Sequence, residues 1–362
     1  MDIKILVIGY THKYNDKRVF RTVNAFKKIG KVYYQYAGIE KHDESNLTTF
    51  PMKIPPTSNR LGFYKEIYGF DSKILNLVKN LDYDIAYFHY FPITMPLKIF
   101  KEVKKRKKTL IFDLHEIIPE QFLSEKYEKL KRTMWWIFKK QLKLCDGIVS
   151  ISEEALNFML NRTKVKIPNM IVENYALIKI HPLSLNERKK EIVIVGSTDR
   201  NIETSKKLYF NLKKLGFLIK TIGLDVELAD IKLPFLPYEK MMKEISKSFF
   251  TMITYQNRKD PDYPNEKYSL PNKFFDSLAA GTPVILSSRF LSMKKILEQL
   301  NVGVVLDLRD NIETNMDKIL HNINDYPNLI ESIKRNIDKF VWNETKEKEF
   351  LDFVISLSHR RD

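Results

Sequence analysis

Cysteine is almost absent from this chain of 362 residues, in which Cys145 is the single example. One thiol cannot form an intramolecular disulfide, so a disulfide-stabilised scaffold is excluded and a reducing compartment is favoured. Long apolar runs are also missing. The first ten residues have too short an apolar run and the wrong flanks for a signal peptide, and no run of about 18 apolar residues is available to span a membrane. We therefore expect a cytoplasmic protein.

The signatures of several ligand classes are absent as well. There is no GxxxxGK[ST] phosphate-binding loop and no GxGxxG, which argues against a nicotinamide cofactor. The seven histidines are scattered, and neither H-E-x-x-H nor a cysteine pair occurs, so we expect no metal site. RNP-like segments and zinc-finger spacings are missing. We expect no cofactor and no nucleic-acid partner.

Positive charge, by contrast, is abundant, with a formal net charge of +16. Such a surface attracts phosphorylated substrates or anionic lipid, and it is equally compatible with a plain solvated face. Much of the charge lies in residues 101–108 and 126–143. The second stretch has apolar residues at helical spacing, with Trp135 and Trp136 beside them. It is either an interfacial helix on the inner face of the plasma membrane or a core-packed helix with a solvated basic face.

Short apolar runs alternate with helical periodicity along the whole chain. Residues 167–191 interrupt this pattern with two prolines and no sustained period, which indicates a crossing between domains. Strands alternating with helices predict parallel, doubly wound sheets. We thus predict an α/β protein of two Rossmann-like domains, at 1–175 and 176–340, with a terminal helix at 341–362. The expected strands are 3–9, 31–37, 83–91, 109–116 and 146–152, then 191–196, 217–223, 249–255, 282–288 and 302–308.

The stretch "SLPNKFFDSLAAGTPVILSS" (269–288) predicts a short helix between two loops. Ser269 is the expected N-cap, Pro271 suits the first turn, and Gly281 suits the left-handed position after the helix. The free N–H groups at the helix start, together with Lys273, would form an anion site. Asp276, one turn further on, is placed to accept from ribose hydroxyls. The alternative is that Lys273 and Asp276 form an i, i+3 pair on a solvated face.

Five segments in this order resemble those of the GT-B glycosyltransferases, in particular glycosyltransferase family 4 and its bacterial polysaccharide-assembly members. The segments are "NDKRVFRTVNAFKKIG", "DIAYFHYF", "FDLHEIIPE", "CDGIVSISE" and "SLPNKFFDSLAAGTPVILS". The resemblance implies two Rossmann-like domains facing a cleft, with a nucleotide-sugar donor bound mainly by the second. It also implies transfer with retention and without metal, and a final helix that crosses back to the first domain.

One departure from the family concerns its two glutamates eight positions apart. The second falls on Asp276, one methylene shorter, and the first falls on Tyr268, while Glu266 lies nearby but out of register. The resemblance therefore implies ribose contact through Asp276. We expect backbone N–H groups of the segment Leu270–Asn272 to replace the first glutamate in contacting the sugar. Leu270, Pro271 and Asn272 are therefore part of the predicted donor site.

The resemblance and the strand ends together supply the remaining candidate residues. His115 is the predicted group that orients or deprotonates a hydroxyl, with Glu116 as its orienting partner or a second candidate. Alternatively, His115 packs against a neighbouring carbonyl. Thr11, His12, Arg18 and His89 are expected on the acceptor side, His89 being the one for which a purely structural role is the main alternative.

On the donor side, Arg200 and Lys273 are expected to stabilise the leaving diphosphate, and Gly196, Ser197 and Thr198 form the adjoining turn. Phe235 or Leu236 is expected to contact the nucleobase. The alternatives are that Arg200 pairs with Asp199 at the surface and that Phe235 and Leu236 are core residues.

The expected activity is transfer of a hexosyl group from a nucleotide sugar, with UDP favoured, to a glycan or lipid-linked acceptor in surface polysaccharide synthesis. A nucleotide-sugar epimerase of the same architecture is one alternative. A non-catalytic GT-B partner subunit is another, motivated by the aromatic Tyr268 at a glutamate position.

Overall fold

The computed structural model describes residues 3–54, 60–89, 97–121, 128–196, 206–253, 262–307 and 309–359. The chain divides into two compact units. Unit 1 comprises Met1–Val172 and Glu344–Asp362, and unit 2 comprises Glu173–Asn343. Within the described residues, no helix has both the length and the apolar character needed to cross a bilayer.

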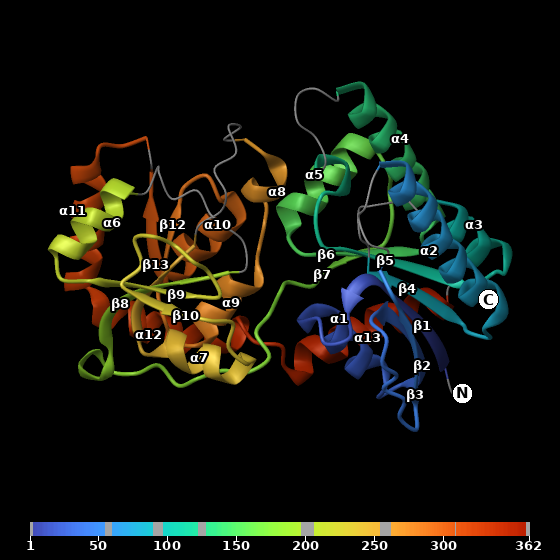
Figure 1. Cartoon of the computed structure of the whole chain (residues 1–362), viewed down its shortest axis with the longest axis horizontal. Helices are drawn as coiled ribbons and strands as arrows, with labels where there is room; N and C mark the ends of the chain where they lie inside the picture. The colour runs from blue at the N-terminus through green and yellow to red at the C-terminus, as the bar shows by residue number, and fades with distance from the viewer. Residues whose placement is uncertain are drawn as a thin grey trace. The chain divides into compact units, whose positions relative to one another are not determined.

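Unit 1 is built on a parallel sheet of seven strands in the order β3-β2-β1-β4-β5-β6-β7 (Figure 1). The strands are β1 (Ile3–Lys13), β2 (Gly30–Ala37), β3 (Leu47–Met52), β4 (Ile85–His89), β5 (Thr109–Leu114), β6 (Gly147–Ser150) and β7 (Asn169–Ile171). The helices are α1 (Lys17–Phe26), α2 (Arg60–Asn80), α3 (Leu97–Lys105), α4 (Glu128–Leu144), α5 (Glu153–Thr163) and α13 (Glu344–His359).

Unit 2 repeats the architecture with a parallel six-stranded sheet in the order β10-β9-β8-β11-β12-β13. The strands are β8 (Lys189–Val195), β9 (Leu218–Ile222), β10 (Ile231–Leu233), β11 (Ser248–Met252), β12 (Val284–Ser287) and β13 (Gly303–Leu306). The helices are α6 (Lys206–Lys214), α7 (Tyr238–Ser246), α8 (Pro264–Lys267), α9 (Asn272–Ala279), α10 (Leu291–Leu300), α11 (Ile312–Asn324) and α12 (Tyr326–Asn336).

The strand order identifies where each unit is suited to bind a ligand. Parallel strands covered on both faces are largely apolar, and all residues of β4, β5 and β11 are buried, including the polar His89 and Asp113. The order reverses direction between β1 and β4 in unit 1 and between β8 and β11 in unit 2. In open α/β sheets, ligands bind outside the carboxyl ends of the strands at such a reversal. The carboxyl ends of β1, β4 and β5, and those of β8 and β11, are therefore the expected ligand-binding edges of the two sheets.

The first strand runs further than its sequence indicates. We expected it to end at Gly9, but β1 continues to Lys13, so Thr11 and His12 lie on the strand instead of in a loop. Gly9 marks a close approach of two strands, because a Cβ there would lie 2.8 Å from the carbonyl oxygen of Gln35. The Gln35 amide then accepts from the N–H of Tyr10 and donates to its carbonyl, both at 2.9 Å.

The last helix of the chain packs in unit 1. The ring of Phe350, which is 1% exposed, lies 5.4 Å from that of Phe26 and 5.8 Å from that of Tyr87, measured between centroids. Gly147 at the start of β6 provides room for Leu357, since a Cβ at this glycine would lie 2.3 Å from a methyl group of that leucine. α13 thus completes the hydrophobic core of a unit whose sheet is formed by the first part of the chain.

Candidate functional site

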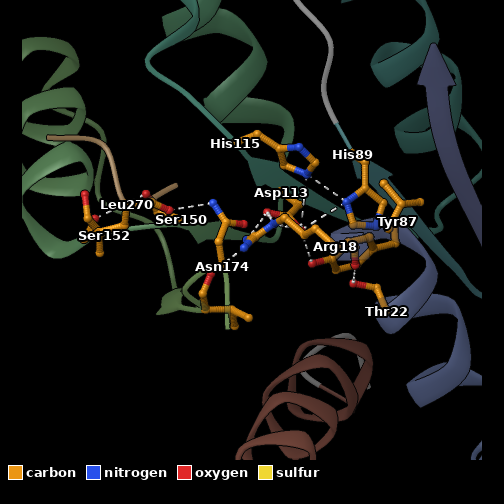
Figure 2. Close-up of polar contacts among 12 residues, drawn as sticks. Arg18, Thr22, Tyr87, His89, Asp113, His115, Ser150, Ser152, Asn174 and Leu270 are labelled. Atoms are coloured by element: carbon orange, nitrogen blue, oxygen red, sulfur yellow. Dashed lines mark hydrogen bonds and ion pairs between the residues drawn. The ribbon is translucent and has the colours of Figure 1, made fainter. Parts of the chain in front are cut away.

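A buried ion pair lies beneath the carboxyl end of the unit 1 sheet. Asp113 near the end of β5 is 1% exposed and accepts from Nη2 of Arg18 at 2.6 Å and from Nε at 3.2 Å (Figure 2). Nη1 of Arg18 donates to the carbonyl of Val172 at 2.6 Å. A buried charge pair is tolerated when hydrogen bonds satisfy its remaining atoms. Arg18, which was predicted on the acceptor side, is 3% exposed and anchors Asp113 within the unit, and its contact with an acceptor stays a prediction.

Two histidines lie next to the second oxygen of Asp113. Nδ1 of His89 lies 3.2 Å from Oδ2 of Asp113 and 3.0 Å from Nε2 of His115, and Tyr87 donates its hydroxyl to the same Oδ2 at 3.0 Å (Figure 2). The structure therefore brings together side chains that the sequence placed at the ends of two different strands. We call Arg18, Tyr87, His89, Asp113 and His115 the buried polar cluster.

The cluster contains a spacing that also suits a metal ion. Within the described residues, His89, Asp113 and His115 are the group of ligand atoms close enough to one another to hold one. The same atoms are joined by the hydrogen bonds above, and Arg18 already supplies a positive charge to the carboxylate. A divalent cation in this buried place would face that guanidinium without a second carboxylate to offset it. The donor set therefore fits hydrogen bonding better than metal binding.

Burial and charge set the protonation of these groups in opposite ways. Burial alone would raise the pKa of Asp113, yet Arg18 and the two histidines hold that pKa well below its usual value. For His89, burial lowers the pKa although the hydrogen bond to Asp113 acts the other way. Burial also holds the pKa of His115 well below its usual value. At neutral pH the cluster therefore contains an ionised aspartate and two neutral imidazoles.

His12 extends the cluster from β1. Its ring centroid lies 4.8 Å from that of His115, and its Nδ1 lies 3.2 Å from Oδ2 of Asp16. Asp16 caps α1 by accepting from the backbone N–H groups of Arg18 and Val19. Three of the four residues predicted on the acceptor side, His12, Arg18 and His89, thus lie in the buried polar cluster or against it.

Thr11 and Glu116 flank this group. Thr11 is partly buried next to His12 on β1, and Glu116 is exposed. The carboxylate of Glu116 accepts from the side-chain amide of Gln121. Among the described residues, His89 on the neighbouring strand β4 lies within hydrogen-bonding distance of His115, while the predicted orienting role of Glu116 stays a prediction.

In unit 2, the expected donor stretch forms α9. The helix begins at Asn272 with Pro271 as its N-cap, so Ser269 is not the cap we expected. Gly281 has φ of +76°, as predicted for the left-handed position after the helix. Lys273 and Asp276 are 9% and 3% exposed, which excludes a pair on a solvated face.

Asp276 has a partner that its sequence neighbourhood did not reveal. The Tyr238 hydroxyl at the start of α7 donates to Oδ1 of Asp276 at 2.7 Å and accepts from the backbone N–H of Leu177 at 3.0 Å. Burial, followed by the negative charge of Asp276, raises the pKa of Tyr238 well above its usual value. The hydroxyl therefore stays protonated and fixes the orientation of the carboxylate. The motif "LPYEKMM" contains Tyr238, but local sequence gives no sign of this pairing.

The loop before α9 is held by side-chain contacts within unit 2. The side-chain amide of Asn174 donates to the carbonyl of Leu270 at 2.8 Å. Glu266, which is 7% exposed, pairs with Arg289. Tyr268, at the position of the first family glutamate, lies 6.0 Å from Nζ of Lys267, measured to the ring centroid. Glu266, which lies in α8 just before this loop, is therefore already engaged by a cation.

Phe235 and Leu236, the two candidates for the nucleobase, lie in different surroundings. Phe235 is 69% exposed, and its ring lies against Gly223, where an added Cβ would be 3.0 Å away. Leu236 packs against the core of the unit. Gly196 follows β8 and donates its N–H to the carbonyl of Ile222 at 3.2 Å. Phe235 is thus no core residue, whereas Leu236 is partly buried at the edge of the core. Ser197, Thr198 and Arg200 lie outside the described residues.

The basic helix α4 presents its two tryptophans differently. Trp135 is 6% exposed and donates its indole N–H to Glu120 at 2.9 Å. Trp136 is 56% exposed, with Nζ of Lys140 lying 3.4 Å from its ring centroid. One face of α4 is therefore core, and the other carries an exposed aromatic ring among basic residues.

Comparisons with known proteins agree with this architecture. Residues 32–173 match the family model for glycosyltransferase family 4. Sucrose-phosphate synthase from Thermosynechococcus elongatus has a similar structure, with a TM-score of 0.73, 13% identity and coverage of 99% of this chain and 100% of that one. A search of curated protein sequences found no match.

Two further solved structures are similar over nearly the full length. WaaG, a glycosyltransferase involved in lipopolysaccharide biosynthesis, has a TM-score of 0.65 and 11% identity, with coverage of 97% of this chain and 99% of that one. Anabaena Alr3699/HepE in complex with UDP-glucose has a TM-score of 0.65 and 11% identity, with coverage of 98% and 100%. The chain thus has the GT-B fold of these proteins, and residues 32–173 of its first unit are similar to glycosyltransferase family 4.

Proposed function

We propose that this protein transfers a hexosyl group from a nucleotide sugar, with UDP as the favoured nucleotide, to a glycan or lipid-linked acceptor. Unit 2 would bind the donor and unit 1 the acceptor, without a metal and with retention of the anomeric configuration. The observation that carries the proposal is the position of α9 and the burial of its two charged side chains. This helix connects β11 to β12 next to the strand-order reversal, and it buries Lys273 and Asp276 instead of leaving them on a solvated face.

The chemistry of α9 suits a nucleotide diphosphate. A helix start preceded by Pro271 presents backbone N–H groups to an anion, and Lys273 adds a full charge in the same turn. Asp276, oriented by Tyr238, supplies the acceptor that ribose hydroxyls require. The exposed ring of Phe235 offers a face on which a base can lie. The solved structure of Alr3699/HepE holds UDP-glucose on the same fold, which supports a uridine nucleotide.

The acceptor is proposed to bind at the carboxyl edge of the unit 1 sheet. The neutral imidazoles and His12 lie at the carboxyl ends of β1, β4 and β5, where unit 1 is suited to bind a ligand. The exposed Trp136 and the basic side chains of α4 would place the protein at an anionic membrane surface in the cytoplasm, as suits a lipid-linked acceptor in surface polysaccharide synthesis.

Two variants test the donor site. Asp276→Asn keeps an oxygen for the Tyr238 hydroxyl but removes the charge, and we expect a loss of transfer of about 10- to 100-fold. Lys273→Met keeps the aliphatic stem but removes the cation facing the diphosphate, with an expected loss of about 10²–10³-fold. The control is Asp262→Ala, an exposed carboxylate in the same unit that pairs with Lys267.

Thermal-shift measurements with UDP, GDP, ADP and their sugars identify the nucleotide, and acceptor-free incubation identifies the reaction type. We expect stabilisation by UDP and product formation only when an acceptor is present. Product formed from the donor alone would indicate an epimerase, and failure to bind any nucleotide would indicate a non-catalytic subunit. Wild-type transfer rates in both site variants would remove the assignment to α9.

A further inference from the structure

The two histidines of the buried polar cluster require a defined arrangement of protons. Nδ1 of His89 and Nε2 of His115 lie 3.0 Å apart. Two imidazole nitrogens at this distance form a hydrogen bond only if one carries the proton and the other accepts it. The structure thus allows two arrangements, which give His115 opposite chemical roles.

Asp113 distinguishes the two arrangements. Its Oδ2 lies 3.2 Å from Nδ1 of His89 but 3.8 Å from Nε2 of His115. Because Arg18 keeps this carboxylate ionised, Oδ2 only accepts. A proton on Nδ1 of His89 faces both acceptors at once. The reverse arrangement would set the lone pair of His89 against the carboxylate in a buried place, where such a repulsion is costly.

We propose that His89 is a positioning residue that holds His115 as the Nδ1–H tautomer, so that His115 offers a substrate a hydrogen-bond donor and not a base. The Nε2 lone pair of His115 is then occupied by the proton of His89. Figure 2 shows the other ring nitrogen of His115 pointing away from Asp113 and His89. The side chain is 17% exposed, so this nitrogen is the end of the ring that a ligand reaches.

The Nδ1–H tautomer limits the chemistry available to His115. A neutral Nδ1–H donates to an oxygen, such as a sugar hydroxyl or a phosphate oxygen, and it cannot remove a proton from the acceptor. The lowered pKa of His115 agrees with a ring that stays neutral in the free protein. The tautomer itself does not depend on the proposed transferase function, whereas the role toward a substrate rests on it.

Nuclear magnetic resonance of nitrogen-15-labelled histidine tests the tautomer directly. In the wild-type protein without ligands at neutral pH, we expect Nδ1 of His115 in the protonated shift range and Nε2 in the unprotonated range. His115→Asn assigns the signals by removing them. Protonation at Nε2, or a doubly protonated ring, overturns the proposal, and so does a stoichiometric shift of both histidines on addition of zinc chloride, which would reveal a metal site.

Two variants of His89 separate positioning from packing. His89→Asn keeps a side-chain N–H close to the place of Nδ1 and should preserve the tautomer of His115. His89→Leu removes the donor, and we expect the proton of His115 to move to Nε2, next to Asp113. The control is His42→Asn. The ring of His42 stacks on that of Tyr14 within the same unit, and its replacement should leave the signals of His115 unchanged. Retention of the Nδ1–H tautomer in folded His89→Leu would contradict the proposal.

Kinetics test the role toward the substrate. For His89→Leu we expect KM for one substrate to rise about tenfold with a smaller change in kcat. This is the effect of losing the hydrogen bond that Nδ1–H of His115 donates to the bound substrate. His89→Asn should restore the wild-type KM. A fall in kcat at unchanged KM would indicate a base and overturn this part. If transfer is undetectable in the wild type, the proposed function fails while the tautomer result stands alone.

Discussion

At the scale of single residues, partners distant in sequence determine the chemistry. The sequence placed His115 and His89 at strand ends, where functional side chains gather, and the structure confirms that position. It did not reveal that Asp113 joins them to Arg18, which is 95 residues away in the chain. Hydrogen bonds across a parallel sheet depend on strand order and register, which local patterns do not encode. The same limit hid the contact of Tyr238 with Asp276.

The buried histidines predict a loss of stability in mild acid. Unfolded histidine takes up a proton near pH 6.5, whereas burial lowers the pKa of His89 and His115 in the folded protein. Below about pH 6.5 the unfolded state therefore binds more protons than the folded state. As a result, the free energy of unfolding decreases as the pH decreases. The slope should reach about 1.4 kcal/mol per pH unit for each histidine, until the pH reaches the folded-state pKa.

Urea denaturation at a series of pH values measures this slope. His89→Asn should reduce it, and His359→Asn, at an exposed position on α13, should keep the wild-type slope. The charged and titratable groups that face His89 are His12, His115, Arg18, Tyr87 and Asp113. An unfolding free energy that stays constant below pH 6.5 would mean that these rings protonate as easily inside the protein as outside.

At the scale of elements, strong periodicity was a good guide and short or edge elements were not. The apolar runs predicted β4, β5, β8 and β12 within a few residues. Three strands were missed. β7 and β10 have three residues each, too few to show a period, and β3 at the sheet edge contains Pro51, which only an edge strand tolerates. The two ends of α9 differ in the same way. The left-handed Gly281 after the helix was predicted correctly, but the N-cap was expected at Ser269 and lies at Pro271.

Gly281 provides a test of how α9 is held. Its φ of +76° favours glycine, and a Cβ there would lie 2.7 Å from Cα of Pro182. Gly281→Ala should therefore cost more than the about 1–2 kcal/mol of left-handed strain alone. Gly216→Ala is the matched control, since Gly216 has φ of +82° but its nearest neighbour is the end of the Lys190 side chain at 3.4 Å. Chemical denaturation compares the two, and equal losses would mean that the contact with Pro182 relaxes without cost.

At the scale of the whole molecule, the ends of the chain belong to one unit and its middle to the other. The fold class was predicted correctly from the alternation of strands and helices, and the repeat of a short apolar strand ending near Gly196 marked the second sheet. Periodicity alone shows that the last segment is a helix, but it does not show which core that helix completes. In the structure, α13 buries Phe350 against Phe26 and Tyr87 of unit 1.

This arrangement predicts that a substitution near the C-terminus loosens the beginning of the chain. Phe350→Ala removes a ring that is 1% exposed, and such a change costs about 3–5 kcal/mol in a well-packed core. We expect faster amide hydrogen exchange in α1, β4 and β5, with unit 2 unaffected, as read by mass spectrometry.

Leu329→Ala is the matched control, because Leu329 is fully buried in the core of unit 2 and its replacement should loosen β8 and β11 instead. Since the two units have separate cores, each variant should lower the stability of its own unit first. Equal loosening of both units by either variant would show that the two cores unfold as one cooperative structure.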